Sequence, residues 1–216
     1  MKKMFVLLSG VLLLSLAQTV RADVPDPDVL IKETVREVLD VVRKDQELRA
    51  GNQKKMLELV DAKVLPHFNF EHMTRLAVGK SWRTATPEQK QALMNEFRIL
   101  LVRTYTKAFT SYRDQVVEIK PLKLDAAATE VTVKTSIVKP GSSQQPVLVD
   151  YDMEKMPNGW KVYDLTVEGV SLVTSYRSTF ADQIQQAGID GLIKTLVEKN
   201  QSAASNAAVA EKAGNK

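Results

Sequence analysis

Residues 147–167 read VLVDYDMEKMPNGWKVYDLTV, and the rest of the predicted fold is arranged around them. Apolar side chains alternate with polar ones on both sides of Pro157-Asn158-Gly159, a combination typical of a β-hairpin with a tight turn. Similar alternation occurs around 117–119 and over 131–137, with a looser turn at 139–143. The pattern therefore predicts about four antiparallel strands that follow one another in a meander.

Apolar residues at helical spacing flank the predicted strands on both sides. The strongest start signal is Thr86-Pro87-Glu88-Gln89, where Thr86 suits an N-cap, Pro87 the first helical position and Gln89 a capping box. Further helices are predicted from Asp26-Pro27, over 53–65, over 69–78, over about 171–188 and from Asp190. We therefore expect an α+β fold, in which a curved antiparallel sheet of about four strands has N-terminal and C-terminal helices on one face.

The first residues of the chain predict export. Lys2 and Lys3 precede the apolar stretch 4–17, and Val20-Arg21-Ala22 offers the small residues that a signal peptidase reads. This is the layout of a secretory signal peptide, and the apolar stretch is shorter than the roughly 20 residues of a membrane helix. We therefore expect cleavage after Ala22 and a periplasmic protein, with an uncleaved N-terminal anchor as the alternative.

Composition limits the class of function. Removal of residues 1–22 takes away three basic residues and no acidic one, which lowers the formal net charge from +4 to +1. The remaining basic residues are interleaved with acidic ones, so we expect no nucleic-acid partner. The chain has no cysteine, hence neither a disulfide nor a thiol nucleophile. We expect one α+β domain over 23–199 and a disordered tail over 200–216, which is rich in Ala, Ser, Asn and Lys.

The two faces of the predicted hairpin differ in polarity. Strict alternation gives a drier face with Val147, Val149, Tyr151, Met153, Trp160 and Val162. It gives a wetter face with Leu148, Asp150, Asp152, Glu154, Lys161, Tyr163, Leu165 and Val167. The helices have apolar stripes to set against the drier face. A filled core and a ligand pocket have the same composition, so this pattern leaves both open.

Several longer motifs resemble one known family. Residues 76–89, LAVGKSWRTATPEQ, closely resemble a segment of the toluene-tolerance family of periplasmic phospholipid-binding proteins, the MlaC type. Residues 101–105, 162–173 and 176–192 continue the likeness, which spans roughly Pro27 to Lys199. One departure is Ala77-Val78-Gly79, where the family often has leucine before the glycine.

This resemblance implies a nuclear-transport-factor-like sheet and helices enclosing a deep hydrophobic pocket. Acyl chains of a diacyl phospholipid would enter the pocket as cargo, with the headgroup in water and no cofactor. The implied partners are an inner-membrane ABC transporter complex and an outer-membrane lipoprotein complex, and the implied role is maintenance of outer-membrane lipid asymmetry. On this basis 23–199 is a lipid-binding domain, and we expect its lipid-binding residues to be Leu101, Tyr105, Val147, Val149, Tyr151, Trp160, Val162, Val167, Val170 and Val173.

Val170 follows Gly169 at the junction between the last predicted strand and a helix, which in the family lies at the pocket. We expect Val170→Glu to leave a folded protein with little bound lipid, because acyl chains would desolvate the new carboxylate. The alternative is that Val170 is an ordinary core residue.

Residues that could carry chemistry are few. His67 and His72 lie five apart, which is unfavourable for a metal site, so we expect surface or packing roles for them. Asp164, assigned by alternation to the drier face, is the best candidate base, although a structural hydrogen bond at the sheet end is favoured. Arg83 suits a lipid phosphate, a partner's acidic patch or a helix cap. We expect no catalytic residue and no metal; a carrier of another apolar ligand, such as a hydrocarbon or quinone, and an isomerase-like enzyme are the alternatives.

Overall fold

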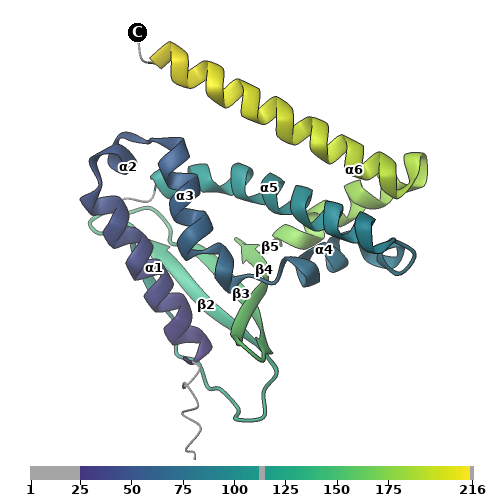
Figure 1. Cartoon of the computed structure of the whole chain (residues 1–216). Coiled ribbons are helices and arrows are strands. Elements are labelled where there is room, and N and C mark those ends of the chain that lie inside the picture. Colours follow the sequence, from purple (N-terminus) through teal and green to yellow (C-terminus); the bar gives the residue numbers. More distant parts are fainter. Residues whose placement is uncertain (1–24, 112–114, 215–216) are drawn as a thin grey trace, which may run out of the picture.

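The computed structural model describes residues 25–111 and 115–214, so the predicted signal peptide lies outside the described residues (Figure 1). The helices before the sheet are α1 (Pro27–Lys44), α2 (Gln46–Ala50), α3 (Gln53–Lys63), η1 (Leu65–His67), α4 (Phe70–Val78), η2 (Gly79–Arg83) and α5 (Pro87–Ser111). The strands are β1 (Val116–Ile119), β2 (Glu130–Val138), β3 (Val147–Met156), β4 (Gly159–Val167) and β5 (Val170–Ser171), and α6 (Leu172–Gly214) follows them. No helix of the described ranges is long and apolar enough to cross a membrane.

The predicted meander is confirmed, with one addition. The sheet has the order β1-β2-β3-β4-β5, and every neighbouring pair is antiparallel. The additional strand is β5, whose two residues pair with Val167 and Thr166, so the chain makes one more turn before α6 begins. That turn holds Glu168 and Gly169 at φ values of 51° and 81°. The α+β class is therefore as expected, with five strands instead of about four.

A β-bulge in β4 changes which residues share a face. Asp152 pairs with Asp164, whereas the next residue of β3, Met153, pairs with Val162, so Tyr163 is an extra residue in β4. Because side chains alternate in a strand, one extra residue reverses the faces of all residues beyond it. Leu165 and Val167 therefore lie on the same face as Trp160 and Val162. The prediction from strict alternation, which placed these pairs on opposite faces, was wrong.

The helices pack in two groups over and beside the sheet. The capping box of α5 is present: the Gln89 backbone N–H donates to Thr86 Oγ1 at 3.2 Å, and the Thr86 N–H donates to Gln89 Oε1 at 3.0 Å. Figure 1 shows α1 and α3 crossing in front of the sheet and α4 at its side. A cluster of α4, η2, α5 and α6 contains the buried residues Met73, Trp82, Leu93, Phe97, Leu101, Val173, Phe180 and Leu192. A second cluster joins α1 to the sheet through Ile31, Val133, Met153, Trp160 and Val162.

The C-terminal region is helical where we expected disorder. α6 bends at Gly188, whose φ of 71° is accessible to glycine at little cost, and then continues through residues 200–214. Asn200 is buried against α5, and its Nδ2 donates to the Glu96 carbonyl at 3.0 Å and to Glu96 Oε2 at 2.7 Å. Alanine favours helix, and extension of an existing helix avoids the cost of nucleation. The Ala-rich composition that indicated disorder therefore extends the helix instead.

Candidate functional site

The inner face of the sheet, which lies toward α1, is almost wholly apolar. The registers place on this face Val117, Ile119, Val131, Val133, Thr135, Ile137, Val147, Val149, Tyr151, Met153, Trp160, Val162, Leu165 and Val167. The Thr135 hydroxyl donates to the Val149 carbonyl at 2.9 Å, so one of the few polar groups on this face is already satisfied. This face can therefore bind an apolar ligand without leaving that hydroxyl unpaired.

One half of the inner face is filled by the protein itself. Near the β3–β4 turn, Met153, Trp160 and Val162 are buried against Ile31 of α1, with Phe68 packed beside them. The backbone of Phe68 forms a parallel bridge with Val162, and the Asn69 N–H donates to the Val162 carbonyl at 2.8 Å. Trp160 and Val162, which we predicted to bind lipid, are in this filled half and act as core residues.

The other half of the inner face is open. Ile137, Val147, Tyr151 and Val167 all retain accessible surface, and Val149 between them is buried. We call these five residues the open half. In the described ranges, α3 and α5 make their main backbone contacts with other helices and have no comparable contact with any strand. At the end of the sheet away from the β3–β4 turn, four of the five residues therefore keep part of their surface accessible.

The pKa of Tyr151 reports on the burial of its phenol group. Burial raises the pKa of the Tyr151 phenol to about 12, and a hydrogen bond with Thr135 opposes the shift. Nevertheless the side chain keeps some accessible surface. Tyr151 also packs against the cluster of the filled half, so it lies at the boundary between the filled and the open half.

The predicted helical site residues belong to a different cluster. Leu101 and Val173 are buried among α4, α5 and α6, and Tyr105 packs against the same cluster. Burial raises the pKa of Tyr105, as does its hydrogen bond with Tyr176. The structure therefore brings Val147, Val149, Tyr151 and Val167 together on the sheet, and separately groups Leu101, Tyr105 and Val173.

Val170 is neither core nor interior. It pairs with Val167, so its side chain is on the inner-face side of the edge strand, but it is 59% exposed. In this conformation a carboxylate at position 170 would meet water. The alternative that Val170 is an ordinary core residue was therefore wrong, and the effect of Val170→Glu on lipid binding stays a prediction.

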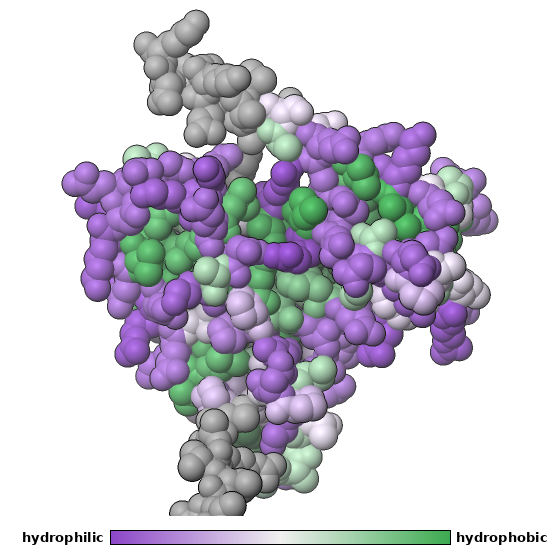
Figure 2. All heavy atoms as spheres, viewed as in Figure 1, coloured by the Kyte–Doolittle hydropathy of each residue, from purple (hydrophilic) through white to green (hydrophobic). Residues whose placement is uncertain are grey.

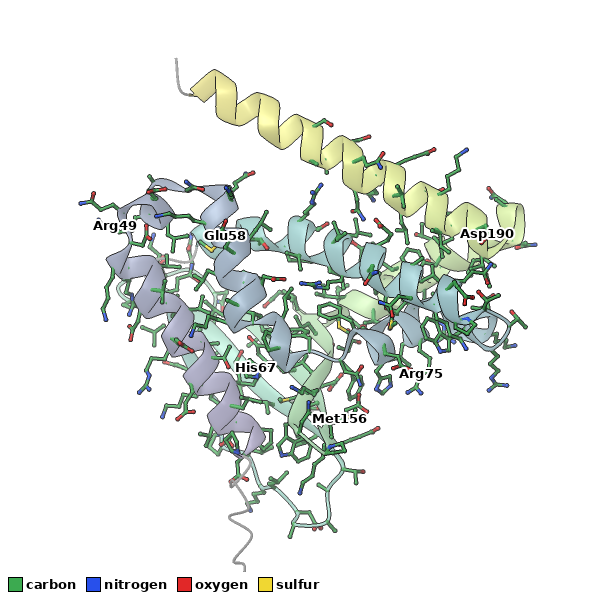
Figure 3. The ribbon with its side chains drawn as sticks, in the orientation of Figure 1. Arg49, Glu58, His67, Arg75, Met156 and Asp190 are labelled. Carbon is green, nitrogen blue, oxygen red and sulfur yellow. The ribbon has the colours of Figure 1, made fainter. Side chains whose placement is uncertain are left out.

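A surface groove, which the sequence did not predict, lies between α3 and α5. It has a volume of about 360 Å³ and is lined by Leu57, Glu58, Asp61, Leu65, Arg98, Ile99, Val102 and Arg103. Asp61 and Arg98 form an ion pair across it, and Figure 3 shows Glu58 on α3. Figure 2 shows apolar side chains at the surface in the middle of this helical side, ringed by hydrophilic ones. The lining comes from α3, η1 and α5, and no sequence signal gives how these helices pack against one another.

Asp164 has a structural role. The bulge places it with Asp152 on the outer face, not on the drier face as expected. Its Oδ1 accepts from the backbone N–H groups of Leu165 at 2.8 Å and Val173 at 3.1 Å, and its Oδ2 accepts from the Ser171 hydroxyl. Ser171 Oγ in turn accepts from the Thr174 N–H at 3.0 Å. Asp164 and Ser171 therefore cap the first turn of α6, the hydrogen-bonding role favoured from the sequence.

The two histidines lie in packing positions. His72 stacks on Tyr163 with ring centroids 4.4 Å apart, and its Nδ1 lies 2.8 Å from Glu154 Oε1, which also accepts from Asn69. Burial, followed by the charge of Lys161, lowers the pKa of His67. In the described ranges no group of three or more His, Cys, Asp or Glu residues could hold a metal ion. Arg83 is exposed at the end of η2, so its predicted roles stay predictions.

Comparison with known proteins identifies the family. A family model described as MlaC protein matches residues 32–198. The chain belongs to the MlaC family. The resemblance of residues 76–89 and the later motifs is thus confirmed.

Relatives of this MlaC-family chain cover at least 83% of its length. A protein of Haemophilus influenzae named intermembrane phospholipid transport system binding protein MlaC is 24% identical over 207 residues, which are 95% of this chain and 94% of the relative. Toluene tolerance protein ttg2D of Pseudomonas putida is 27% identical over 192 residues, 83% and 85% of the two chains. A solved phospholipid-binding protein from Ralstonia solanacearum, in complex with a phospholipid, is 39% identical. It aligns with a TM-score of 0.76 over 83% of this chain and 99% of that one.

We predict that Asp164→Ala destabilises the protein by about 2 kcal/mol, because it leaves the buried Val173 N–H at the start of α6 and the partly buried Leu165 N–H of β4 without their acceptor. Asp152→Ala is the control: Asp152 accepts from the exposed Thr132 hydroxyl, and its loss should cost under about 0.5 kcal/mol. Urea denaturation measures both. Equal stabilities would contradict the capping role and make Asp164 a candidate base again.

We predict a pH dependence from Tyr151. Its pKa is about 12 in the folded protein and about 10 in the unfolded chain, so the stabilisation is complete below pH 10 and is lost as pH rises toward 12. Ultraviolet titration should show one tyrosine fewer ionising near pH 12 in Tyr151→Phe. If that variant loses a tyrosine that ionises near pH 10, the phenol is not desolvated.

Proposed function

We propose that this protein binds a phospholipid with its acyl chains against the open half of the inner face and carries it through the periplasm. The observation that carries the proposal is an apolar sheet face, half of which stays partly accessible, in a chain of the MlaC family. The relative solved with a phospholipid aligns over almost its whole length, which supports the same ligand here.

The physical chemistry favours a carrier over an enzyme. Burial of each methylene contributes about 0.8 kcal/mol, so a chain of about 16 carbons gains on the order of 12 kcal/mol before ordering costs. Spontaneous release into water is then slow, since affinity differences are expressed mainly in the off-rate. Asp164, the strongest candidate base, already accepts three hydrogen bonds. We therefore propose binding and transfer without a catalysed reaction.

Release requires a partner that offers the acyl chains a second apolar path. We propose that the partners are an inner-membrane ABC transporter complex and an outer-membrane lipoprotein complex, between which the carrier shuttles to maintain lipid asymmetry. The name of the Haemophilus influenzae relative, which places that protein in an intermembrane phospholipid transport system, supports this proposal. Cleavage of the chain after Ala22 would release it into the periplasm.

We predict that the purified protein carries diacyl phospholipid at near-stoichiometric amounts, and that Val147→Glu lowers the bound amount at least about fivefold. Val147 is at the start of β3, so the carboxylate can reach water when the site is empty but is desolvated by acyl chains. Met156→Glu, at the exposed opposite end of the same strand, is the control and should retain its lipid. Lipid extraction and mass spectrometry give the readout, and circular dichroism checks the fold.

Each other outcome has a clear meaning. A hydrocarbon or quinone in the extract in place of phospholipid would show a carrier of another ligand. An empty protein that stays empty when mixed with phospholipid would contradict the proposal. Normal lipid in Val147→Glu would place the acyl chains elsewhere, for example in the groove between α3 and α5.

A further inference from the structure

The turn between β4 and β5 has an unusual first residue. Val167 pairs with Val170, so Glu168 and Gly169 are the two central residues of a tight hairpin loop. Their φ values are 51° and 81°. Positive φ at both central residues is the mark of a type I′ turn, in which Asn, Asp or Gly usually comes first. Glu168 is the only residue other than glycine with a positive φ in the described ranges, so the turn itself gives no reason for a glutamate there.

The side chain of Glu168 has a partner on the neighbouring strand. The Glu168 backbone N–H donates to the Leu148 carbonyl of β3 at 2.9 Å, and the Leu148 N–H donates back to the Glu168 carboxylate. In a regular antiparallel pair, both bonds join backbone groups of the two residues. Here the carboxylate takes the place in which a continuing strand offers its carbonyl oxygen. Glu168 therefore extends the β3–β4 ladder by one pair beyond Val149 and Val167.

Side-chain length explains why glutamate suits this contact. Asparagine is better tolerated at positive φ, but its amide is one methylene closer to the backbone than the Glu168 carboxylate. The backbone conformation of Glu168 is costly for a residue with a long side chain, and two hydrogen bonds to Leu148 hold it. Residues that depart from the preferred turn chemistry and are held by their surroundings are concentrated at functional sites.

The tied turn lies beside the open half. Leu148 stands between Val147 and Val149 in β3, and Val167 directly precedes Glu168 at the end of β4. All three valines belong to the open half. The bond between Glu168 and Leu148 therefore fixes β4 against β3 at the end of the sheet where the inner face stays partly accessible.

The same turn connects the sheet to the helical cluster. Figure 1 shows β5 beside the start of α6. Both are tied to β4, through the pairing of Val170 with Val167 and through the hydrogen bond from Ser171 to Asp164. The Glu168 carboxylate ties this group in turn to β3. It therefore contributes to the separation between β3 and the first turn of α6.

We propose that Glu168 is a positioning residue of the lipid site, whose carboxylate holds the β4–β5 turn against β3 and so keeps the open half closed around acyl chains. The proposal rests on the phospholipid-carrier function. Glu168 touches no acyl chain and acts through the backbone of Leu148. The Leu148 N–H lies in an exposed part of the protein, so water can replace the carboxylate at little cost in stability. Loss of the carboxylate should therefore speed lipid release more than it lowers stability.

The test separates the reach of the side chain from the preference of the turn. Glu168→Gln retains an acceptor oxygen at the same distance from the backbone, whereas Glu168→Asn suits the turn but is too short to reach Leu148. Glu118→Gln is the matched control, because Glu118 is an exposed glutamate on the same cross-strand row as Leu148, beyond β2. Each mature protein is loaded with phosphatidylethanolamine that has one fluorescent acyl chain, and its release into excess protein-free phospholipid vesicles is followed.

We expect Glu168→Asn to release lipid about tenfold faster than the parent, the usual order for loss of a hydrogen bond to a charged group. Glu168→Gln and Glu118→Gln should release it within about twofold of the parental rate. In urea, Glu168→Asn should be at least as stable as the parent, because asparagine relieves the backbone strain. In the lipid-free proteins, amide hydrogen exchange at Leu148 should be faster in Glu168→Asn than in Glu168→Gln or the parent.

Three results would overturn the positioning role. A parental release rate in Glu168→Asn, with faster exchange at Leu148, means that the bond exists but does not retain lipid. Fast release from Glu168→Gln as well makes the charge the cause, as in direct contact with a cationic headgroup. Equal exchange at Leu148 in all four proteins removes the bond itself. A parent protein that takes up no phospholipid contradicts the carrier function and the proposal together, whereas the carrier function stands in the other three cases.

Discussion

The pairing of β3 with β4 across the bulge at Tyr163 is the constraint on which the interior depends. The extra residue brings Leu165 and Val167 onto the face that already has Trp160 and Val162. Without it, the two ends of β4 would contribute to opposite faces, and the inner face would have apolar residues at one end only. The same bulge places Tyr163 against His72 of α4, so the helical cluster is joined to the sheet at this point.

With β4 aligned on β3 in this way, the inner face consists of a filled half and an open half. The filled half, with Met153, Trp160 and Val162 under Ile31, gives the fold a core of its own. That core lets the other half stay open, because stability does not require every apolar residue of the sheet to be covered by protein. A carrier needs both: a structure that persists when empty, and apolar surface that only a ligand covers.

Polar contacts in otherwise apolar surroundings fix α6 at its start and again at Asn200. Asp164 and Ser171 cap its first turn, and Asn200 binds Glu96 of α5 far along the chain. Directional hydrogen bonds fix position in a way that apolar contacts do not, so these residues set where α6 lies relative to α5 and the sheet. The α4–α6 cluster thus stands as a unit beside the sheet.

Local signals in the sequence were sufficient for four of the five strands, most helix starts, the capping box at Thr86 and Gln89, and the family, because each depends on residues close together in the chain. They also placed Val147, Val149 and Tyr151 on one face. They could not place Leu165 and Val167, since a bulge depends on how two strands meet. Whether Trp160 is core or pocket depends on what α1 covers, and the exposure of Val170 depends on a two-residue strand. The helix over 200–214 follows Asn200, which is held by hydrogen bonds to Glu96. These two residues lie 104 positions apart in the chain, so no local signal links them. Composition is the same for a filled and a hollow interior, so only the tertiary structure separated the residues buried under α1 from those that stay partly exposed.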